Sequence, residues 1–513
     1  MPVSWDVIVI GSGFGGVFAA LPLVESGARV LMLERGPWVT RGPHNWEPDG
    51  TLEKTPYYNH DHRYAVLEGG EGPWVGMASC VGGASVFYGG VSFRLRVPDF
   101  DPDPTQAATS GARWPFGYGE LEPWYDRAEE LLHVAGEAGK DPTEPPRRRP
   151  YPEPPGPLGE TSQMIARAGR SLGLAPFRLP LAISYRGEEH ACRLCPTCDT
   201  FACAVSAKND LATTLIPRLV QQGMELRCET IVTRLIVAGD RVTGVEVADK
   251  RTDGGRETLH APVVVLAAGA LATPHLLLAS GIDERSSAPH AVGRYLTRHC
   301  NGIVIGIFPR VPDRGKRFHK QIGFNDFYHG TPGGPAGTLG SIQQLQTPPI
   351  ALVKENSPRL MHPFMKLGLP HTTGLLCMAE DQAQIDNGVW LDRSRTDAYG
   401  LPGLQVRQRY SPRDLQGRAA LYAQARRILR RAGALFFYHH DIKTFSHAAG
   451  TVRFGDDPRT APLDPECRFR GLANLFVTDA SFLPSCGGVN PSLTISANAL
   501  RVGTALARNG GGQ

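Results

Sequence analysis

Four residues near the start of the chain have the types and the spacing of a dinucleotide-binding site. Gly11, Gly13 and Gly16 follow an apolar run at residues 6–10, and Glu34 ends the next apolar run. In such a motif the first glycine permits a tight turn, the second lets the backbone approach a pyrophosphate, and the third lets a helix pack on the strand. The helix N-terminus then faces the diphosphate, and the carboxylate accepts hydrogen bonds from ribose hydroxyls. The combination predicts a dinucleotide site, whereas the glycines alone would indicate only a strand, a turn and a helix.

A second glycine-rich segment, residues 76–90, contains paired glycines among apolar side chains. Glycine lets a backbone turn repeatedly or come close to a flat group. A flexible loop would be richer in polar residues. We therefore expect this segment to form a wall against a cofactor.

Four cysteines, Cys192, Cys195, Cys198 and Cys203, crowd into one short stretch. Thiolates at this spacing can converge on an iron–sulfur cluster, with Cys203 as a fourth ligand, or on a tetrahedral zinc ion. The longer gap before Cys203 and the Ala204 that follows it differ from the ferredoxin pattern, in which a proline follows the last cysteine. We expect reduced or disulfide-paired cysteines packed in a loop, and keep the cluster and the zinc site as alternatives.

The hydrophobic pattern indicates which elements position these residues. Residues 6–10, 28–33 and 261–270 have the pattern of buried strands in one parallel sheet. Residues 230–247 alternate apolar and polar side chains around a turn, which predicts antiparallel strands. A further strand at 474–481 precedes the segment that begins at Asn490.

The remaining segments are less regular. A helix is expected at 496–507, with Pro491 in its first turn, and a charged outer helix at 413–431. Pro22 should kink the first helix. The proline-rich residues 142–157 predict an extended surface linker whose arginines are solvated.

The composition excludes several classes of protein. The chain has 513 residues, 41% of them hydrophobic, and a net charge of +4. No basic run with interleaved aromatics points to a nucleic-acid partner. No apolar run approaches the ~20 residues of a membrane helix, and no signal-like segment precedes the first strand. We expect a soluble cytoplasmic protein of more than one domain.

Several separated motifs occur in one order along almost the whole chain. They are the first glycines with Glu34; Gly82-Gly83-Ala84-Ser85-Val86-Phe87-Tyr88-Gly89-Gly90 with Asp99-Phe100-Asp101; Trp114-Pro115 with Leu121–Tyr125; residues 263–274; Glu380 with Asn387, Val389 and Leu391; and Asn490-Pro491-Ser492-Leu493-Thr494. With these motifs the sequence resembles the glucose–methanol–choline (GMC) flavin oxidoreductases.

The resemblance implies an α/β fold with two domains. A Rossmann-like FAD-binding domain with a parallel sheet would comprise residues 1–100, 205–300 and 445–513. An α+β substrate domain on an antiparallel sheet would comprise residues 101–204 and 301–444. The proline-rich segment would be an excursion from the second domain.

The resemblance also implies which residues contact FAD. Gly11, Gly13, Gly16 and Glu34 would hold the ADP part, and the backbone of Val232 the adenine. The isoalloxazine would lie against Gly82, Gly83, Ser85 and Tyr88, and Asp479 would bind the ribityl or pyrophosphate region. Further contacts are expected at Ala268, Gly269, Pro491 and Thr494. Fungal pyranose oxidases attach FAD to a histidine of the glycine-rich loop, which residues 76–90 lack, so non-covalent FAD is expected.

The catalytic pair of the family corresponds to His447 and Asn490. The pattern His447, Gly450, Thr451, Arg453, Gly455 resembles pyranose oxidases, sugar 3-oxidases and aminoglycoside dehydrogenases. Alcohol oxidation needs a base with a pKa near neutrality, which histidine supplies, and an amide can hold the substrate oxygen as charge develops. Taken singly, His447 could instead be a buried hydrogen-bonded histidine and Asn490 a helix cap.

The function expected from these residues is FAD-dependent oxidation of an alcohol on a sugar, glycoside or aminoglycoside. The alternatives are a non-sugar secondary-metabolite alcohol, a lyase that keeps FAD as structure, and a pyridine-nucleotide enzyme that uses only the first motif. Oxygen, a quinone or a redox protein would accept the electrons.

Overall fold

The structure is a computed structural model. It describes residues 5–46, 65–68, 78–101, 110–187, 190–195, 197–252, 255–315, 317, 320–345, 354, 359–445 and 447–510. Its strands form four sheets, one parallel and others antiparallel or mixed, and this α/β arrangement confirms the predicted fold class.

The first sheet is parallel and is built from short, buried, β-branched strands. In spatial order they are β17 (Leu475–Val477), β9 (Val263–Leu266), β1 (Val7–Ile10), β2 (Val30–Leu33) and β5 (Glu225–Arg227). The strands β9, β1 and β2 are buried at every position, as expected for a sheet covered on both faces. The prediction that the strand within residues 261–270 belongs to the same sheet as the first strand is confirmed, since Val7 pairs with Val263.

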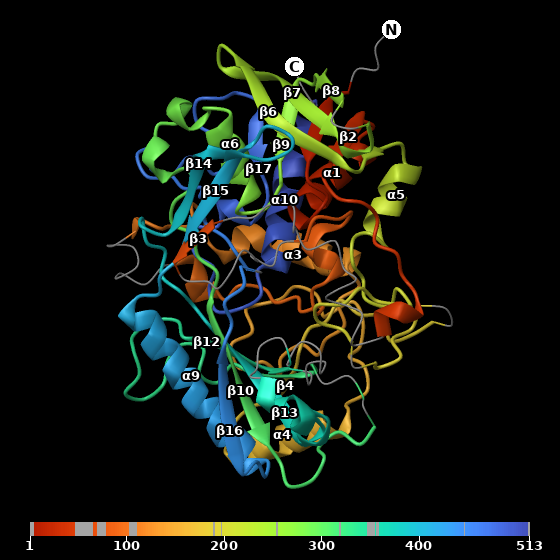
Figure 1. Ribbon diagram of the computed structural model, residues 1–513, viewed down its shortest axis with the longest axis vertical. Helices are drawn as coiled ribbons and strands as arrows, with labels where there is room; N and C mark the ends of the chain where they lie inside the picture. Colours follow the sequence, from red (N-terminus) through yellow and green to blue (C-terminus); the bar gives the residue numbers. More distant parts are fainter. Residues whose placement is uncertain are drawn as a thin grey trace.

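Two long helices pack side by side against this sheet (Figure 1). They are α1 (Phe14–Glu25) and α10 (Ser492–Arg508). A Cβ at Gly503 would lie 2.3 Å from the carbonyl oxygen of Ala19, so glycine is needed for the two backbones to approach this closely. The helix α10 begins four residues before the predicted start, directly after Pro491, and α1 continues through Pro22 to Glu25.

A three-stranded antiparallel sheet lies next to the first sheet, where β6 contacts β2. Its strands are β6 (Thr230–Ala238), β7 (Arg241–Asp249) and β8 (Gly255–Leu259). The alternation of apolar residues predicted β6 and β7 correctly, whereas β8 was not predicted. Val232 of β6 is buried. It lines the same cavity as Gly11 and Gly13 of the glycine turn after β1, which we call the Rossmann turn.

The second large sheet has six antiparallel strands and lies below the first in Figure 1. In spatial order they are β16 (Phe436–Asp441), β10 (Cys300–Ile307), β13 (Thr372–Ala379), β12 (Gly340–Leu345), β11 (Ile322–Phe324) and β4 (Phe177–Arg178). The helices α9 (Pro412–Arg431) and α4 (Glu160–Ser171) pack on one face, over a core that includes Val304 and Ile342. Because side chains alternate along a strand, Gln343 of β12 points to the opposite face.

A small third sheet joins segments far apart in sequence. It consists of β14 (Gly388–Thr396), β15 (Pro402–Arg407) and β3 (Ala65–Glu68). Its strands come from both of the domains proposed from the sequence. The domain boundaries themselves stay a prediction.

The proline-rich segment forms no helix or strand, but its arginines are not all solvated. The side chain of Arg147 is only 7% exposed, pairs with Glu129 at 2.5 Å and lies 3.8 Å above the Tyr151 ring. Glu129 also pairs with the buried Arg94. The prediction of a solvated arginine run is therefore wrong for Arg147, because Glu129 of α3 (Tyr118–Leu131) offers a buried partner.

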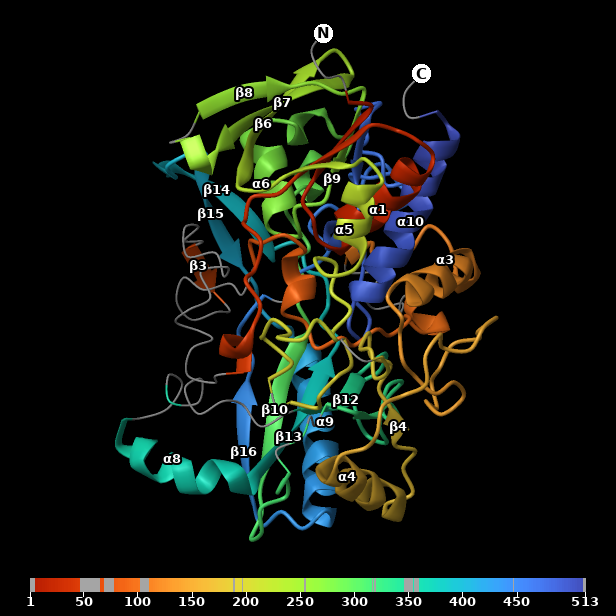
Figure 2. The same cartoon turned by 90° about the vertical axis from the view of Figure 1, so that its right-hand side faces the viewer.

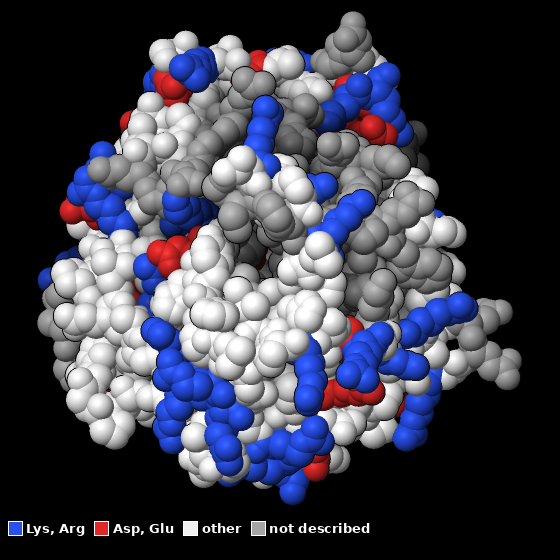
Figure 3. Space-filling view, turned by 60° about the horizontal axis from the view of Figure 1, so that its bottom comes forward, with Lys and Arg blue, Asp and Glu red and all other residues white. Residues whose placement is uncertain are grey.

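Exposed arginines gather at the end of the molecule that carries α4 and α9, seen from two sides in Figures 1 and 2 and turned toward the viewer in Figure 3. They are Arg167, Arg170, Arg426, Arg427, Arg430 and Arg431. The residues belong to two helices that are distant in sequence, so no basic run announces the cluster. Within the described residues no helix is long and apolar enough to cross a membrane.

Candidate active site

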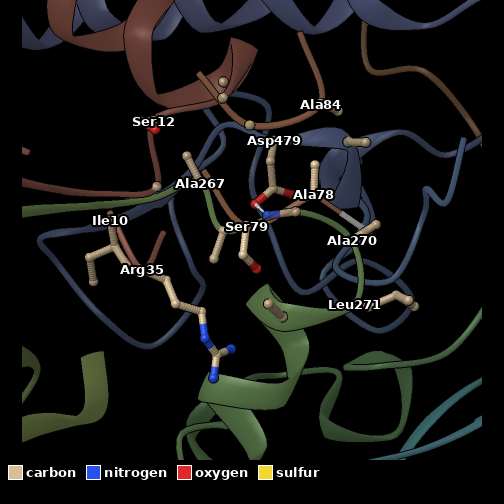
Figure 4. A pocket seen from close by; sticks show the side chains of 18 of the residues that line it. Ile10, Ser12, Arg35, Ala78, Ser79, Ala84, Ala267, Ala270, Leu271 and Asp479 are labelled. Atoms are coloured by element: carbon tan, nitrogen blue, oxygen red, sulfur yellow. Dashed lines mark hydrogen bonds between the residues drawn. The ribbon is translucent and has the colours of Figure 1, made fainter. Parts of the chain in front are cut away.

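A cavity of about 260 Å³ lies between the parallel sheet and the C-terminal segment. Many of the predicted cofactor and catalytic residues line it: Gly11, Gly13, Glu34, Gly83, Val232, Ala268, Gly269, His447, Asp479 and Pro491. Figure 4 shows Ser12, Ala267 and Asp479 around one hollow, although they follow three different strands. Gly16, Gly82, Ser85, Tyr88, Asn490 and Thr494 are absent from this lining. The binding and catalytic roles of all these residues stay predictions.

The three glycines of the first motif meet different constraints. Gly11 has a φ of +104°, and a Cβ there would lie 2.3 Å from the Ala267 carbonyl oxygen. A Cβ at Gly16 would lie 1.9 Å from the Gly11 carbonyl oxygen, so this glycine is needed for packing. A Cβ at Gly13 would meet no protein atom within 4 Å, yet Gly13 lines the cavity. Its open side leaves room for a group outside the protein, which fits the pyrophosphate of FAD.

Glu34 is held in place by the turn that it faces. Its Oε2 accepts hydrogen bonds from the Ser12 backbone N at 3.1 Å and from Ser12 Oγ at 2.6 Å. Its Oε1 accepts from the Gly36 backbone N at 2.9 Å. Burial raises the pKa of this carboxyl. Oε1 accepts only one of these hydrogen bonds and keeps acceptor capacity, which fits the predicted contact with a ribose.

Asp479 is similarly fixed at the end of β17. Its Oδ2 accepts from the Gly269 backbone N at 3.0 Å and from Thr273 Oγ1 at 2.5 Å. Its Oδ1 accepts from the backbone N and the hydroxyl of Ser481. Burial raises the pKa of this carboxyl too. Asp479 therefore ties the turn after β9 to the C-terminal segment and brings two predicted cofactor contacts together.

The glycine-rich segment reaches the same cavity through its first half. Gly83 has a φ of +54° and packs against Gly13, while the Gly82 backbone N donates to Ser12 Oγ at 3.0 Å. Ser85 Oγ donates to the Gly82 carbonyl and accepts from the Leu211 backbone N. Tyr88 O–H donates to the Asn209 carbonyl at 3.3 Å. The side chains of Ser85 and Tyr88 thus shape the loop rather than the cavity wall. Gly76 lies outside the described residues.

Among the described residues, the hydrogen-bond partner of the His447 ring is another histidine. The Nδ1 atoms of His447 and His299 are 3.1 Å apart, and the rings are nearly perpendicular at 87°. His299 Nε2 lies 3.0 Å from the Gly487 carbonyl oxygen. Burial, with smaller effects from His299 and Lys320, holds the pKa of His447 well below 6.5. His447 is therefore neutral at pH 7 and able to accept a proton.

Asn490 lies in the loop between Gly487 and α10. The loop is pressed onto β12, since a Cβ at Gly488 would lie 2.4 Å from the Gly340 Cα. Gln343 Nε2 of β12 donates to Asn490 Oδ1 at 2.9 Å. The Asn490 carbonyl is thereby engaged, and its amide N–H groups can still donate, which fits the predicted catalytic role.

The four crowded cysteines lie next to the glycine-rich segment. All ten cysteines are within the described residues, and none forms a disulfide. Lys208 is buried and donates to the carbonyls of Tyr88, Cys198 and Phe201, which holds the cysteine loop against the glycine-rich loop. Burial raises the pKa of Cys192 to about 11. Among the described residues no group of three or more His, Cys, Asp or Glu is arranged to hold a metal ion.

Sequence reasoning missed three residues of the site: His299, Gln343 and Lys320. Lys320 is buried, pairs with Asp199 at 2.5 Å and acts on His447 through its charge. None belongs to a motif, and a single histidine before an apolar strand would be taken for an ordinary buried side chain. Only the fold brings these residues to the site.

Comparison with known proteins supports the same interpretation of the cavity. The GMC oxidoreductase family models match residues 71–301 and 384–499. The chain is 32% identical to paromamine 6'-oxidase of Streptomyces fradiae, over 98% of this chain and 91% of that protein. It is 28% identical to C-glycoside 3-oxidase of Microbacterium trichothecenolyticum, over 98% and 96% of the two chains.

Solved structures share the fold. Pyridoxine 4-oxidase from Mesorbium loti superposes with a TM-score of 0.68 at 20% identity, covering 99% of both chains. A formate oxidase of Aspergillus oryzae RIB40 superposes with a TM-score of 0.67 at 13% identity, again over 99% of both. Because GMC family models match residues 71–301 and 384–499 and a relative is 32% identical over 98% of the chain, this chain belongs to the GMC oxidoreductase family and is an FAD-dependent oxidoreductase that acts on alcohol groups.

Proposed function

We propose that the chain oxidises an alcohol group of a sugar, glycoside or aminoglycoside, with His447 as the general base. The observation that carries the proposal is the position of His447. It lines the same cavity as Gly13 and Asp479, and burial keeps it neutral. A neutral imidazole beside the cofactor cavity can accept the hydroxyl proton as the alcohol is oxidised. The substrate class is supported by the names of the relatives, which act on paromamine and on C-glycosides.

Bound FAD would supply the acceptor for the hydride that leaves the carbinol carbon. Residues of the chain would take the proton, orient the hydroxyl and hold the cofactor. The substrate O–H bond breaks and its proton moves to His447, while an Asn490 N–H donates to the same oxygen as negative charge develops on it. Gln343 keeps the amide of Asn490 turned for that task. Gly11, Gly13, Glu34 and Asp479 would hold the cofactor without covalent attachment.

We also propose oxygen as the electron acceptor and the cytoplasm as the location. The relatives at 32% and 31% identity are both named oxidases. The absence of disulfides among the ten described cysteines agrees with a reducing compartment. Peroxide formation after anaerobic reduction and readmission of oxygen would distinguish oxygen from a quinone or a redox protein.

The test is an anaerobic screen of sugars, glycosides and aminoglycosides on the FAD-loaded protein, followed by flavin absorbance. We expect one class to bleach the flavin. The change His447→Ala should slow bleaching by at least ~100-fold, the usual contribution of a positioned base. Asn490→Ala should slow it less, because the amide orients the hydroxyl but carries no proton.

The matched control is His290→Ala, because His290 is exposed on the turn Pro289–Ala291 and should leave the rate unchanged. Wild-type bleaching by His447→Ala would disprove the role of the base. Product formation without bleaching would instead identify a lyase. A protein that purifies without yellow colour would point to a pyridine-nucleotide enzyme.

A further inference from the structure

His299 adopts a backbone conformation that is uncommon for residues other than glycine. It immediately precedes β10, is fully buried and has a φ of +61°. Such left-handed backbone is uncommon for a residue other than glycine and persists only where surrounding contacts impose it. Strained residues of this kind cluster at functional sites.

Contacts from two other segments impose the conformation. The carboxylate of the buried Asp381 accepts hydrogen bonds from the backbone N of Arg298 and of His299, each at 2.9 Å. The His299 carbonyl accepts from Tyr410 O–H at 2.9 Å. These hydrogen bonds hold the backbone on both sides of the His299 Cα, which fixes the direction of the imidazole ring.

The hydrogen bonds of the ring determine its tautomer. Nε2 faces the carbonyl oxygen of Gly487 at 3.0 Å, and a carbonyl only accepts, so Nε2 carries the hydrogen. Burial lowers the pKa of His299 to about 4, so the ring is neutral at pH 7 and its Nδ1 is an acceptor. The group that faces this Nδ1, at 3.1 Å, is Nδ1 of His447.

The same logic then applies to His447. His447 Nδ1 faces an acceptor, the Nδ1 of His299, and must therefore carry a hydrogen. The lone pair of the His447 ring is then on Nε2. We propose that His299 is a positioning residue that fixes His447 in the Nδ1–H tautomer, so that Nε2 takes the proton of the substrate hydroxyl. This inference rests on the proposed function of His447 as the base.

The proton balance follows from this arrangement. When the substrate O–H bond breaks, a new N–H bond forms at His447 Nε2, and the imidazolium keeps donating from Nδ1 to His299. FAD, when bound, would supply the acceptor for the hydride, so that the alcohol would become a carbonyl. In the other tautomer of His447 the two Nδ1 lone pairs would face each other, and Nε2 could not accept a proton. A base held in the wrong tautomer loses most of its catalytic effect.

Two variants of the FAD-loaded protein separate positioning from structure. His299→Leu keeps apolar bulk but offers no acceptor to His447. His299→Asn places a carbonyl oxygen near the former Nδ1, and asparagine tolerates left-handed backbone. We expect His299→Leu to slow anaerobic flavin reduction at saturating substrate by ~100-fold, with the substrate Kd nearly unchanged. His299→Asn should restore most of the rate.

Nitrogen-15 NMR of the protein labelled at histidine supplies a readout that a merely structural role would not move. The His447 resonances, assigned by their loss in His447→Ala, should show the Nδ1–H tautomer in the wild-type protein and in His299→Asn. In His299→Leu they should shift toward Nε2–H. The wild-type spectrum keeps the proposal testable even if His299→Leu does not fold.

Two results would overturn the proposal: an Nε2–H tautomer of His447 in the wild-type protein, or flavin reduction at the wild-type rate in His299→Leu. The outcomes for the base are separate. If His447→Ala reduces flavin as fast as wild type, the proposed function of His447 fails. If His447→Ala is slow while His299→Leu is fast, only the role of His299 fails.

Discussion

Gln343 Nε2 donates a hydrogen bond to Asn490 Oδ1 at 2.9 Å, and the same nitrogen donates to Ser341 Oγ at 3.0 Å. Gln343 Oε1 is buried and has no hydrogen-bond partner in the part of the chain that the structure describes. The side chain therefore serves Asn490 while leaving one of its own polar atoms unsatisfied. An unsatisfied buried oxygen costs roughly 1–3 kcal/mol of stability, so this arrangement points to a role in orienting the amide rather than in stabilising the fold.

We predict that Gln343→Leu lowers activity without lowering stability. Without its donor, the Asn490 amide can rotate, and its N–H groups no longer face the substrate oxygen for all of the time. Flavin reduction should slow by ~10-fold, which corresponds to about 1.4 kcal/mol of transition-state stabilisation. The midpoint of thermal unfolding should stay equal or rise, because the leucine removes the unsatisfied oxygen.

The neighbouring residue provides the control. Gln344 is also buried but lies on the opposite face of β12, where its Oε1 accepts from Ser162 Oγ at 2.9 Å. Gln344→Leu also removes a buried polar atom without a partner among the described residues, its Nε2, and should leave flavin reduction nearly unchanged. Equal effects of the two variants on the rate would contradict an orienting role for Gln343.

The pH dependence of flavin reduction should follow His447. Its pKa lies well below 6.5, first because of burial and then because of His299 and Lys320. The base is active when unprotonated, so the rate constant should be level above pH 6.5 and should fall as the pH drops through the lowered pKa. Stopped-flow measurements under anaerobic conditions give this profile directly.

Lys320 offers a test of the electrostatic contribution to the pKa of His447. Lys320→Met removes a positive charge that disfavours the imidazolium. Its removal raises the pKa of His447, so the midpoint of the profile should move to higher pH. Lys320→Arg keeps the charge and should leave the midpoint in place. A midpoint that moves to lower pH in Lys320→Met would show that another group controls the rate.

The Rossmann turn could be predicted from sequence because its signals are local. A β-branched strand, three glycines and an acid at the end of the next strand fall within a single stretch of chain, and each has a mechanical reason to be there. The antiparallel strands β6 and β7 were predictable for the same reason, since two-residue alternation marks each strand.

The partners of the residues predicted to be catalytic could not be predicted in this way. His299 and His447 are 148 residues apart in sequence, and Gln343 and Asn490 are 147 apart. No periodicity connects such pairs, and each residue alone resembles an ordinary buried polar side chain. Arg147 shows the converse error, since its proline-rich surroundings suggested solvent while Glu129 provided a buried partner.

We predict that FAD is released from the protein by acid or heat. The described part of the glycine-rich segment, residues 78–90, contains no histidine. Burial raises the pKa of Cys80 well above its usual value, and the Tyr88 hydroxyl donates to a backbone carbonyl. After acid precipitation the flavin should remain in the supernatant, with the mass of the polypeptide unchanged. A yellow pellet would contradict this prediction.

The two glycines Gly13 and Gly16 should respond oppositely to the same small change. A Cβ at Gly16 would lie 1.9 Å from the Gly11 carbonyl oxygen, so Gly16→Ala should destabilise the apoprotein or prevent folding. A Cβ at Gly13 meets no protein atom within 4 Å, and the φ of −76° suits alanine. Gly13→Ala should therefore cost the apoprotein only about 1 kcal/mol, from the weaker helix cap. Because its methyl group enters the space for the pyrophosphate, the Kd for FAD should rise by at least ~10-fold. Fluorescence titration of apoprotein with FAD, beside thermal unfolding of both variants, measures the two effects; unchanged FAD affinity in Gly13→Ala would place the pyrophosphate elsewhere.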